Sequence, residues 1–221
     1  ISRYKRFLVD VRLKDGSELT IHCPNPGSMM GLKGPGSKVW ISDSNNAKRK
    51  LRFTLELVEV DGVMVGVNTN LANRLAREAI ETDLVPNLSG NARLEPEQRY
   101  GENSRIDFLV RGEDSVDIYI EVKSVTLSRG ANLAEFPDSV SARGSKHLGE
   151  LTKVIAAGHR AILLYVIQRD DCGELNTARD IDPTYAAAFE SAVECGLEVH
   201  AIRCAVSEKG IRPYTTLTIQ S

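Results

Sequence analysis

The sequence lacks the features that mark several classes of protein. Its four cysteines are far apart and form no CxxC pair, which argues against a zinc site and favours the reduced thiols of the cytosol. No apolar run approaches the roughly 20 residues of a membrane span, and no charged-then-apolar leader precedes Tyr4. Aromatic residues make up only 5% of the chain. We therefore expect a cytoplasmic globular protein with no membrane partner and no tightly bound organic cofactor.

The net charge is small, at -2, but it is unevenly distributed. Residues 1–66 contain 11 Lys and Arg against 7 Asp and Glu, whereas the other 155 residues contain 17 against 23. A basic first third permits contact with nucleic acid. Charge alone fits a solvated basic surface without a partner equally well.

The first third carries the pattern of a small β-barrel. Short strands are predicted at residues 5–13, 18–23, 38–42, 52–60 and 63–67. Asp15-Gly16 and Asp61-Gly62 lie between successive strands, and Asp-Gly is a strong hairpin-turn signal. Five strands in about 65 residues favour an oligonucleotide/oligosaccharide-binding (OB) barrel over residues 1–67.

Two basic clusters in this part are candidates for contact with the DNA backbone. The alternative is that they keep the edges of the barrel soluble, and the sequence does not separate the two. The residues are Arg3, Lys5, Arg6, Lys48, Arg49 and Lys50.

The remainder, residues 68–221, predicts an α/β domain with a mixed sheet covered on both faces. Helices are expected at 70–81, 138–157 and 183–195, and strands at 105–111, 117–125, 161–167 and 198–206. Asp138 is the expected N-cap of the middle helix, and Gly158 is expected to end it.

The hairpin at residues 105–125 is the most informative stretch. With a loop at 112–116 centred on Asp114, Asp107 lies opposite Glu121. Alternation then sorts the side chains into two faces. One face is apolar, with Ile106, Phe108, Val110, Ile118, Ile120 and Val122, and the other holds Asp107, Leu109, Tyr119, Glu121 and Lys123.

Two opposed carboxylates repel each other unless a proton, a cation or a metal offsets their charge. Asp107 and Glu121 supply hard oxygen ligands for Mg²⁺ or Mn²⁺, and Lys123 supplies a cation beside a reacting phosphate. A solvated polar face with no chemistry is the structural alternative. The pattern resembles the PD-(D/E)xK nuclease core, in which the acids hold the metal and the lysine orients water or stabilises charge.

Four further residues are candidates for the same site. Glu78 either adds a third acid or pairs with Arg74 one helical turn earlier. Arg143, Lys146 and His147 share one side of a predicted helix and either contact phosphate or the acids, with a plain surface role as the alternative for His147.

Several blocks of the chain also resemble the sugar fermentation stimulation protein A family. They are residues 3–7, 22–29, 68–69, 72–75, 104–108, 119–125, 136–138, 143–144 and 146–148. The resemblance implies an N-terminal OB barrel, a C-terminal nuclease-like domain, DNA binding without strong sequence preference, and a role in regulating sugar (maltose) metabolism. Pro26 departs from the family pattern, where threonine is frequent.

The leading hypothesis is a nucleoid-associated DNA-binding protein that cleaves phosphodiester bonds with a divalent metal. Its oligomeric state is open, and a dimer is one option. The rival is a non-enzymatic DNA-binding regulator with a vestigial site. A barrel that binds sugar directly is a third hypothesis, weakened by the single Trp.

Overall fold

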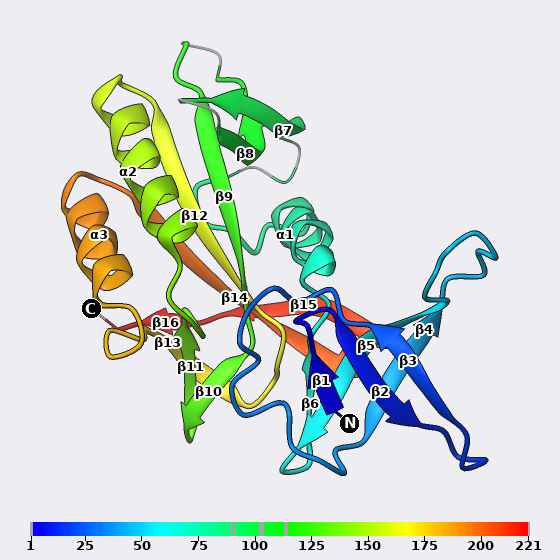
Figure 1. Ribbon diagram of the computed structural model, residues 1–221. Helices are drawn as coiled ribbons and strands as arrows, with labels where there is room; N and C mark the ends of the chain where they lie inside the picture. The colour runs from blue at the N-terminus through cyan, green and yellow to red at the C-terminus, as the bar shows by residue number, and fades with distance from the viewer. Residues whose placement is uncertain (1, 89, 91, 102–103, 113–114, 221) are drawn as a thin grey trace.

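The computed structural model describes residues 2–88, 90, 92–101, 104–112 and 115–220. Its first part is a barrel-like sheet in the strand order β1-β2-β3-β5-β4, with β6 paired to β5 (Figure 1). The strands are β1 (Ser2–Tyr4), β2 (Leu8–Arg12), β3 (Glu18–His22), β4 (Val39–Asp43), β5 (Phe53–Val60) and β6 (Val63–Gly66). The five predicted strands are confirmed, and the short β1 is added to them.

Both Asp-Gly steps lie in hairpin turns, as predicted. Asp61 and Gly62 both have positive φ, at 53° and 80°, which is the conformation of a type I′ turn. Gly16 has φ +86° in the turn between β2 and β3. Alternate residues of the strands then point into one core, which includes Val9, Ile21, Leu55, Val58 and Val65.

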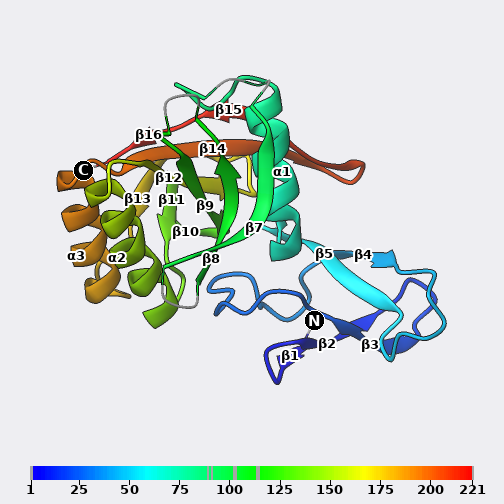
Figure 2. The same ribbon diagram turned by 90° about the horizontal axis from the view of Figure 1, so that it is seen from above.

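The second part is a mixed six-stranded sheet in the order β15-β14-β12-β9-β8-β7, between α1 on one face and α2 and α3 on the other (Figure 2). Its strands are β7 (Leu94–Tyr100), β8 (Ser104–Val110), β9 (Ile118–Val125), β12 (Arg160–Ile167), β14 (Glu198–Ser207) and β15 (Gly210–Thr216). The helices are α1 (Ala72–Glu81), preceded by the 3-10 turn η1 (Thr69–Leu71), α2 (Ala142–Ala156) and α3 (Pro183–Glu194). The mixed α/β class and the covering of both faces are therefore confirmed.

A small third sheet lies beside the large one, in contact with β9 and β14. It has the order β10-β11-β13-β16, from β10 (Leu127–Gly130), β11 (Asn132–Phe136), β13 (Cys172–Thr177) and β16 (Thr218–Ile219). None of these strands was predicted, and neither were β7 and β15. They are short or interrupted, and β7 contains Pro96 at the outer edge of the large sheet, where a missing N–H costs no ladder bond. No helix of the described residues is long and apolar enough to cross a membrane.

The predicted start of the middle helix was wrong. α2 begins at Ala142, and its N-cap is Ser141, whose side chain accepts a hydrogen bond from the backbone N–H of Gly144. Asp138 lies one turn earlier, in the loop before the helix, where its carboxylate has a different partner. The helix ends at Ala156, followed by Gly158 with φ +88°, as Gly158 in the sequence indicated.

Asp138 joins the two parts of the molecule. Its carboxylate accepts the backbone N–H of Met29, at 2.8 Å, and its carbonyl accepts the Ser28 hydroxyl, at 2.6 Å. The loop that carries these groups, residues 24–29, leaves the barrel after β3 and is held from the other side by Arg3. Four of the five N–H donors of Arg3 are used by backbone carbonyls, of which three belong to this loop.

Gly27 is the point at which this contact is tightest. A Cβ added there would lie 2.6 Å from both carboxylate oxygens of Asp138, so Gly27→Ala should displace Asp138 from Met29 and lower the free energy of unfolding by roughly 1–3 kcal/mol. Gly149→Ala is the control, because nothing lies within 4 Å of that position inside α2 and alanine should stabilise the helix. Urea unfolding measures both variants.

The same clash predicts that the two positions are coupled. In an Asp138→Ala background, Gly27→Ala should cost much less, because the obstructing carboxylate is gone. Equal costs in the two backgrounds would contradict this account of the junction.

Candidate active site

Asp107 and Glu121 are brought together by the pairing of β8 with β9. The paired residues are Phe108 with Ile120, Leu109 with Tyr119 and Val110 with Ile118, which is the predicted register. Asp107 directly precedes these pairs, and its carboxylate accepts the backbone N–H of Val122, the residue after Glu121. The predicted loop centre, Asp114, lies outside the described residues.

The predicted sorting of the two faces is correct from Phe108 onward, but Ile106 and Asp107 depart from it, since the Asp107 carboxylate bonds to Asn73 of α1. The apolar face packs under α1, with Phe108, Val110, Ile118, Ile120 and Val122 in one core cluster. Ile106 instead belongs to the core on the α2 side, together with Leu109. Ile106 precedes the three β8 residues that pair with β9, so the alternation that holds there does not extend to it.

The Asp107 carboxylate is held between β9 and α1. Its Oδ2 accepts the backbone N–H of Val122 at 2.7 Å, and its Oδ1 accepts the side-chain amide of Asn73 at 2.9 Å. Each carboxylate oxygen has a second lone pair, so both remain able to bind another group. Asn73 was not predicted at the site, although it lies in the helix predicted at residues 70–81.

The Glu121 carboxylate is buried, with 3% of the residue exposed. Its Oε1 accepts the Lys123 ammonium at 2.6 Å and is also bonded to Nδ1 of His147 on α2. The Nε of Arg143 donates to Nε2 of the same ring at 3.3 Å, and arginine can only donate. Nε2 therefore accepts the hydrogen bond from Arg143, and Nδ1 carries the ring proton and donates a hydrogen bond to Glu121.

The two carboxylates have opposite pKa shifts. Burial and the nearby charge of Glu121 raise the pKa of Asp107 above its ordinary value. Burial acts in the same direction on Glu121, but the hydrogen bond from His147 and the charge of Lys123 outweigh it and lower the pKa of that carboxylate. The two acids of the pair are therefore electrostatically unlike.

Several buried polar side chains lie around this pair on the α2 side. Glu150, at 5% exposure, lies one turn after His147 and is ion-paired with Lys146 at 3.7 Å. Tyr100 is also buried, and its pKa is raised by burial and by the charges of Glu121, Glu150 and Asp107. Within the described residues, Glu121 Oε2, Glu150 Oε2 and the Tyr100 hydroxyl are buried with no hydrogen-bond partner.

Neither Tyr100 nor Glu150 was predicted. The spacing of Glu150 three residues after His147 puts both on one face of a helix, and that was the available signal. Tyr100 gave none, because it belongs to the unpredicted strand β7. The alternative of a plain surface role for His147 is wrong, because the ring is 5% exposed and contacts Glu121.

Glu78 is paired on its own helix. Its carboxylate lies 3.5 Å from the Arg74 guanidinium, which is the pairing that the sequence offered as the alternative. Within the residues that the structure describes, no three His, Cys, Asp or Glu side chains are grouped so that they could hold a metal ion. A cation here would therefore rest on Asp107 and Glu121, with water and substrate oxygens completing its shell, as is common for Mg²⁺.

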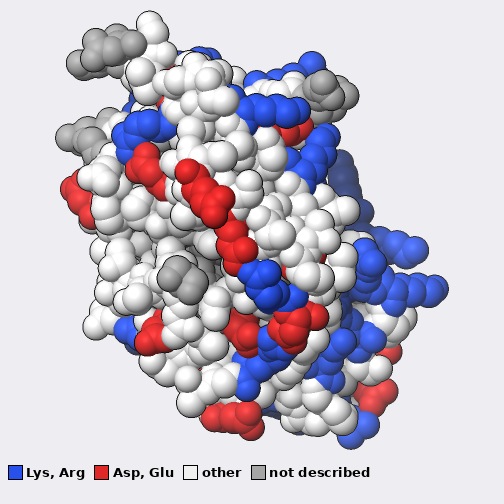
Figure 3. All heavy atoms as spheres, turned by 90° about the vertical axis from the view of Figure 1, so that its left-hand side faces the viewer, with Lys and Arg blue, Asp and Glu red and all other residues white. Residues whose placement is uncertain are grey.

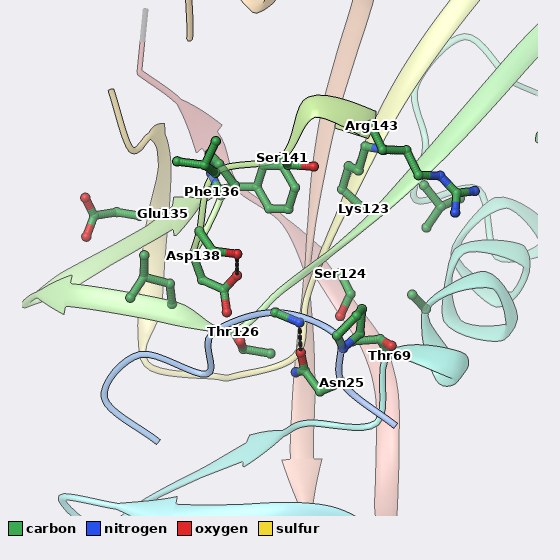
Figure 4. A pocket seen from close by; sticks show the side chains of 18 of the residues that line it. Asn25, Thr69, Lys123, Ser124, Thr126, Glu135, Phe136, Asp138, Ser141 and Arg143 are labelled. Carbon is green, nitrogen blue, oxygen red and sulfur yellow. Dashed lines mark hydrogen bonds between the residues drawn. The ribbon is translucent and has the colours of Figure 1, made fainter. Parts of the chain in front are cut away.

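A pocket of about 660 Å³ opens beside this site, between the barrel and the α/β part (Figure 4). Lys123 and Asn73 line it from the α/β part, and Arg6 and the loop at residues 25–27 line it from the barrel. Residues 135–143 form a further wall. Lys123 thus belongs both to the site and to the wall of a pocket that barrel residues also line.

The predicted basic residues fall into three groups. Arg3 is used by the loop at residues 24–29, as described above. Lys5 and Arg6 are exposed in the turn after β1, where both have positive φ, and Arg6 reaches the pocket. Lys48, Arg49 and Lys50 are exposed in the loop between β4 and β5, and none of the three lines the pocket.

The charge asymmetry of the sequence is visible on the surface. Lys and Arg gather along the right-hand edge in Figure 3, which is the side turned to the reader in Figure 1, where β1 also lies. Acidic side chains lie mainly over the centre and left of the same view. A polyanion would meet a favourable potential at that edge.

Comparison with known proteins agrees with this architecture. Residues 1–67 match the family "SfsA N-terminal OB domain" and residues 70–210 match "Sugar fermentation stimulation protein RE domain". The chain belongs to the SfsA family. A "Sugar fermentation stimulation protein homolog" of Allorhizobium ampelinum is 53% identical over 96% of this chain and 91% of its own length, and one of Brucella ovis is 54% identical over 95% and 88%.

A solved SfsA structure has the same fold. It is "The structure of Pyrococcus Furiosus SfsA in complex with Ca2+", with a TM-score of 0.90, 28% sequence identity, and coverage of 100% of this chain and 94% of the other. The similarity extends over both parts of the molecule, so the arrangement of the OB barrel against the large mixed sheet is shared with that SfsA protein.

The opposite pKa shifts predict how stability depends on pH. The lowered pKa of Glu121 stabilises the fold above the unfolded value of about 4.3, and this contribution disappears as the pH falls through the folded pKa. At pH 7, Glu121→Gln should lower the free energy of unfolding by about 3 kcal/mol, since it removes one member of a buried ion pair. At pH 3 the difference should be much smaller.

Urea unfolding at the two pH values measures this difference. Glu97→Gln is the control, because Glu97 pairs with Arg105 at an exposed site and should contribute little at either pH. A Glu121→Gln penalty that does not change with pH would mean that Glu121 is not stabilised as a carboxylate.

Proposed function

We propose that this SfsA protein binds DNA with little sequence preference and cleaves phosphodiester bonds at a divalent-metal centre held by Asp107 and Glu121. The observation that carries the proposal is the closeness of a half-buried carboxylate, Asp107, to a buried one, Glu121, whose partner Lys123 lines a pocket that the barrel also lines. Structural acids at a surface need neither this burial nor a neighbouring cavity.

The residues present fit a hard divalent cation. Glu121 Oε2 is buried without a hydrogen-bond partner, and both oxygens of Asp107 have a free lone pair. The SfsA structure from Pyrococcus furiosus is described as a complex with Ca²⁺, a cation that takes oxygen ligands. When bound, Mg²⁺ or Mn²⁺ supplies Lewis-acid polarisation of a phosphoryl oxygen.

The side chains of this protein then have distinct roles. Lys123 lines the pocket, so its ammonium is placed to stabilise charge that develops on the phosphate. His147 and Arg143 fix the orientation of Glu121 through its Oε1, which leaves Oε2 for the cation. Lys5 and Arg6 supply cations for the DNA backbone on the barrel side.

A binding-only regulator is the second candidate. The burial of Glu121 and its two partners at Oε1 favour it, since the same contacts would neutralise a vestigial acid. The family name ties these proteins to sugar fermentation, and an effect of cytoplasmic DNA binding on genes of sugar metabolism fits either candidate.

Plasmid nicking separates the two candidates. Supercoiled DNA should be nicked with Mg²⁺ or Mn²⁺ and not with a chelator; Asp107→Ala should abolish nicking, and Lys123→Ala should reduce it at least about 100-fold. In chelator, Asp107→Ala should bind DNA as tightly as the wild type or more tightly, because it removes negative charge, whereas Lys123→Ala should bind more weakly.

Glu78→Gln is the matched control, an acid removed from α1 outside the pair, and it should nick at the wild-type rate. If the wild type and all variants bind DNA but added metal causes no nicking, the protein is the binding-only regulator.

A further inference from the structure

We propose that the 660 Å³ pocket receives one unpaired nucleotide of the DNA, held beside the phosphate that reaches Lys123. This inference rests on the proposed function and adds a substrate feature to it, namely a preference for DNA with an unpaired or extrudable base. The volume of the pocket is within the roughly 300–1,000 Å³ that is usual for small-ligand pockets, and a nucleotide is a ligand of that size.

The wall made by residues 135–143 offers a fixed aromatic ring. Phe136 lines the pocket and is only half-buried, while its ring packs against Tyr165 at 5.5 Å and Tyr185 at 5.2 Å between centroids. Those contacts hold the ring in place without covering it. Aromatic faces of this kind stack on any base, because every base has a π-face.

The polar groups of the pocket suit a base of any identity. Ser124, Thr126 and Ser141 line it with hydroxyls. The Ser124 hydroxyl accepts from the Gln168 side chain and the Ser141 hydroxyl from the N–H of Gly144, so each still has its own O–H to donate. The amide of Asn25 is used by Val67 and Gly27. Every base offers acceptors to such O–H donors, so we expect recognition of an unpaired base without selection of its sequence.

The acids in the same wall are occupied by other groups. Glu135 is ion-paired with Arg129 at 2.5 Å, and the Asp138 carboxylate accepts from Met29. Lys123, Arg6 and Arg143 also line the pocket, and in Figure 4 Lys123 and Arg143 lie on the α1 side, away from Glu135. An entering phosphate would therefore meet cations at the side nearer the carboxylate pair.

Val140, at the pocket, is placed to open the duplex. It is 75% exposed, more than any other large hydrophobic residue of the described chain. Its loop is anchored on both sides, by Asp138 at the barrel and by Ser141, whose backbone N–H donates to Asp182 at 2.7 Å. Exposed apolar side chains on rigid loops are the wedges that proteins insert between base steps.

A second hollow, of about 310 Å³, continues the path toward the barrel. It shares Arg6, Pro26, Gly27 and Ser139 with the pocket and adds Lys5 and Lys33. Tyr4, exposed on β1, lies along it too. A single strand that leaves the pocket needs basic groups near its phosphates and an aromatic ring on which a base can stack, and this hollow offers both.

The test compares two DNAs bound by the full chain in chelator: a paired duplex and the same duplex with one unpaired 2-aminopurine. Fluorescence anisotropy should show at least tenfold tighter binding of the second DNA, and 2-aminopurine emission should change as the base enters the pocket. Val140→Ser, which removes the wedge, and Ala142→Phe, which fills the pocket from an exposed position on α2, should each reduce the preference to below about threefold.

Two controls match these variants. Val193→Ser removes an exposed valine from α3, and Ala156→Phe adds the same ring at the other end of α2, so both should keep the tenfold preference. Equal binding of the two DNAs by a wild type that nicks plasmid would overturn this inference alone. A preference that survives Ala142→Phe would overturn it as well, and a wild type that binds neither DNA would overturn it together with the proposed function.

Discussion

The burial of the Glu121 carboxylate on a central strand is the constraint on which the site depends. An unpaired carboxylate in that position would be strongly destabilising, so the surrounding elements must supply its partners. Lys123 does so from the same strand and His147 from α2, and Arg143 fixes the ring of His147 in turn. The position and orientation of α2 are thereby tied to the chemistry of β9.

The opposed acid, Asp107, has the complementary environment. Its partners, a backbone N–H and the amide of Asn73, are neutral, so the charge of Glu121 is felt without a compensating cation at bonding distance. The two carboxylates therefore share the ammonium of Lys123, which contacts Glu121. This excess of negative over positive charge is the physical reason for proposing a metal at the pair.

The barrel completes the site because one loop is fixed at both ends. Arg3 holds residues 25–28 from the barrel, and Asp138 holds residues 28 and 29 from the nuclease-like part. Asp138 also begins the stretch that leads to Val140 and to the cap of α2. A single contact region therefore sets the spacing between the basic turn after β1 and the carboxylate pair.

The sequence predicted what depends on local pattern. Alternation along β8 and β9 gave the register and the meeting of Asp107 with Glu121, and Asp-Gly steps gave the hairpins. It missed what depends on distant partners. The contact of Asp138 with Met29 joins residues 109 positions apart, so local pattern could not reveal it and Asp138 was predicted to be a helix cap instead. Tyr100 and Glu150 come together only when β7 and α2 pack in the folded protein.

A crystal of the wild-type protein soaked in Mn²⁺ gives the most direct test of the central claim. The account predicts an anomalous-difference peak within bonding distance of both an Asp107 oxygen and Glu121 Oε2, and its loss in Asp107→Asn. A well-ordered map without a peak at the pair, or a peak that persists unchanged in Asp107→Asn, would contradict it.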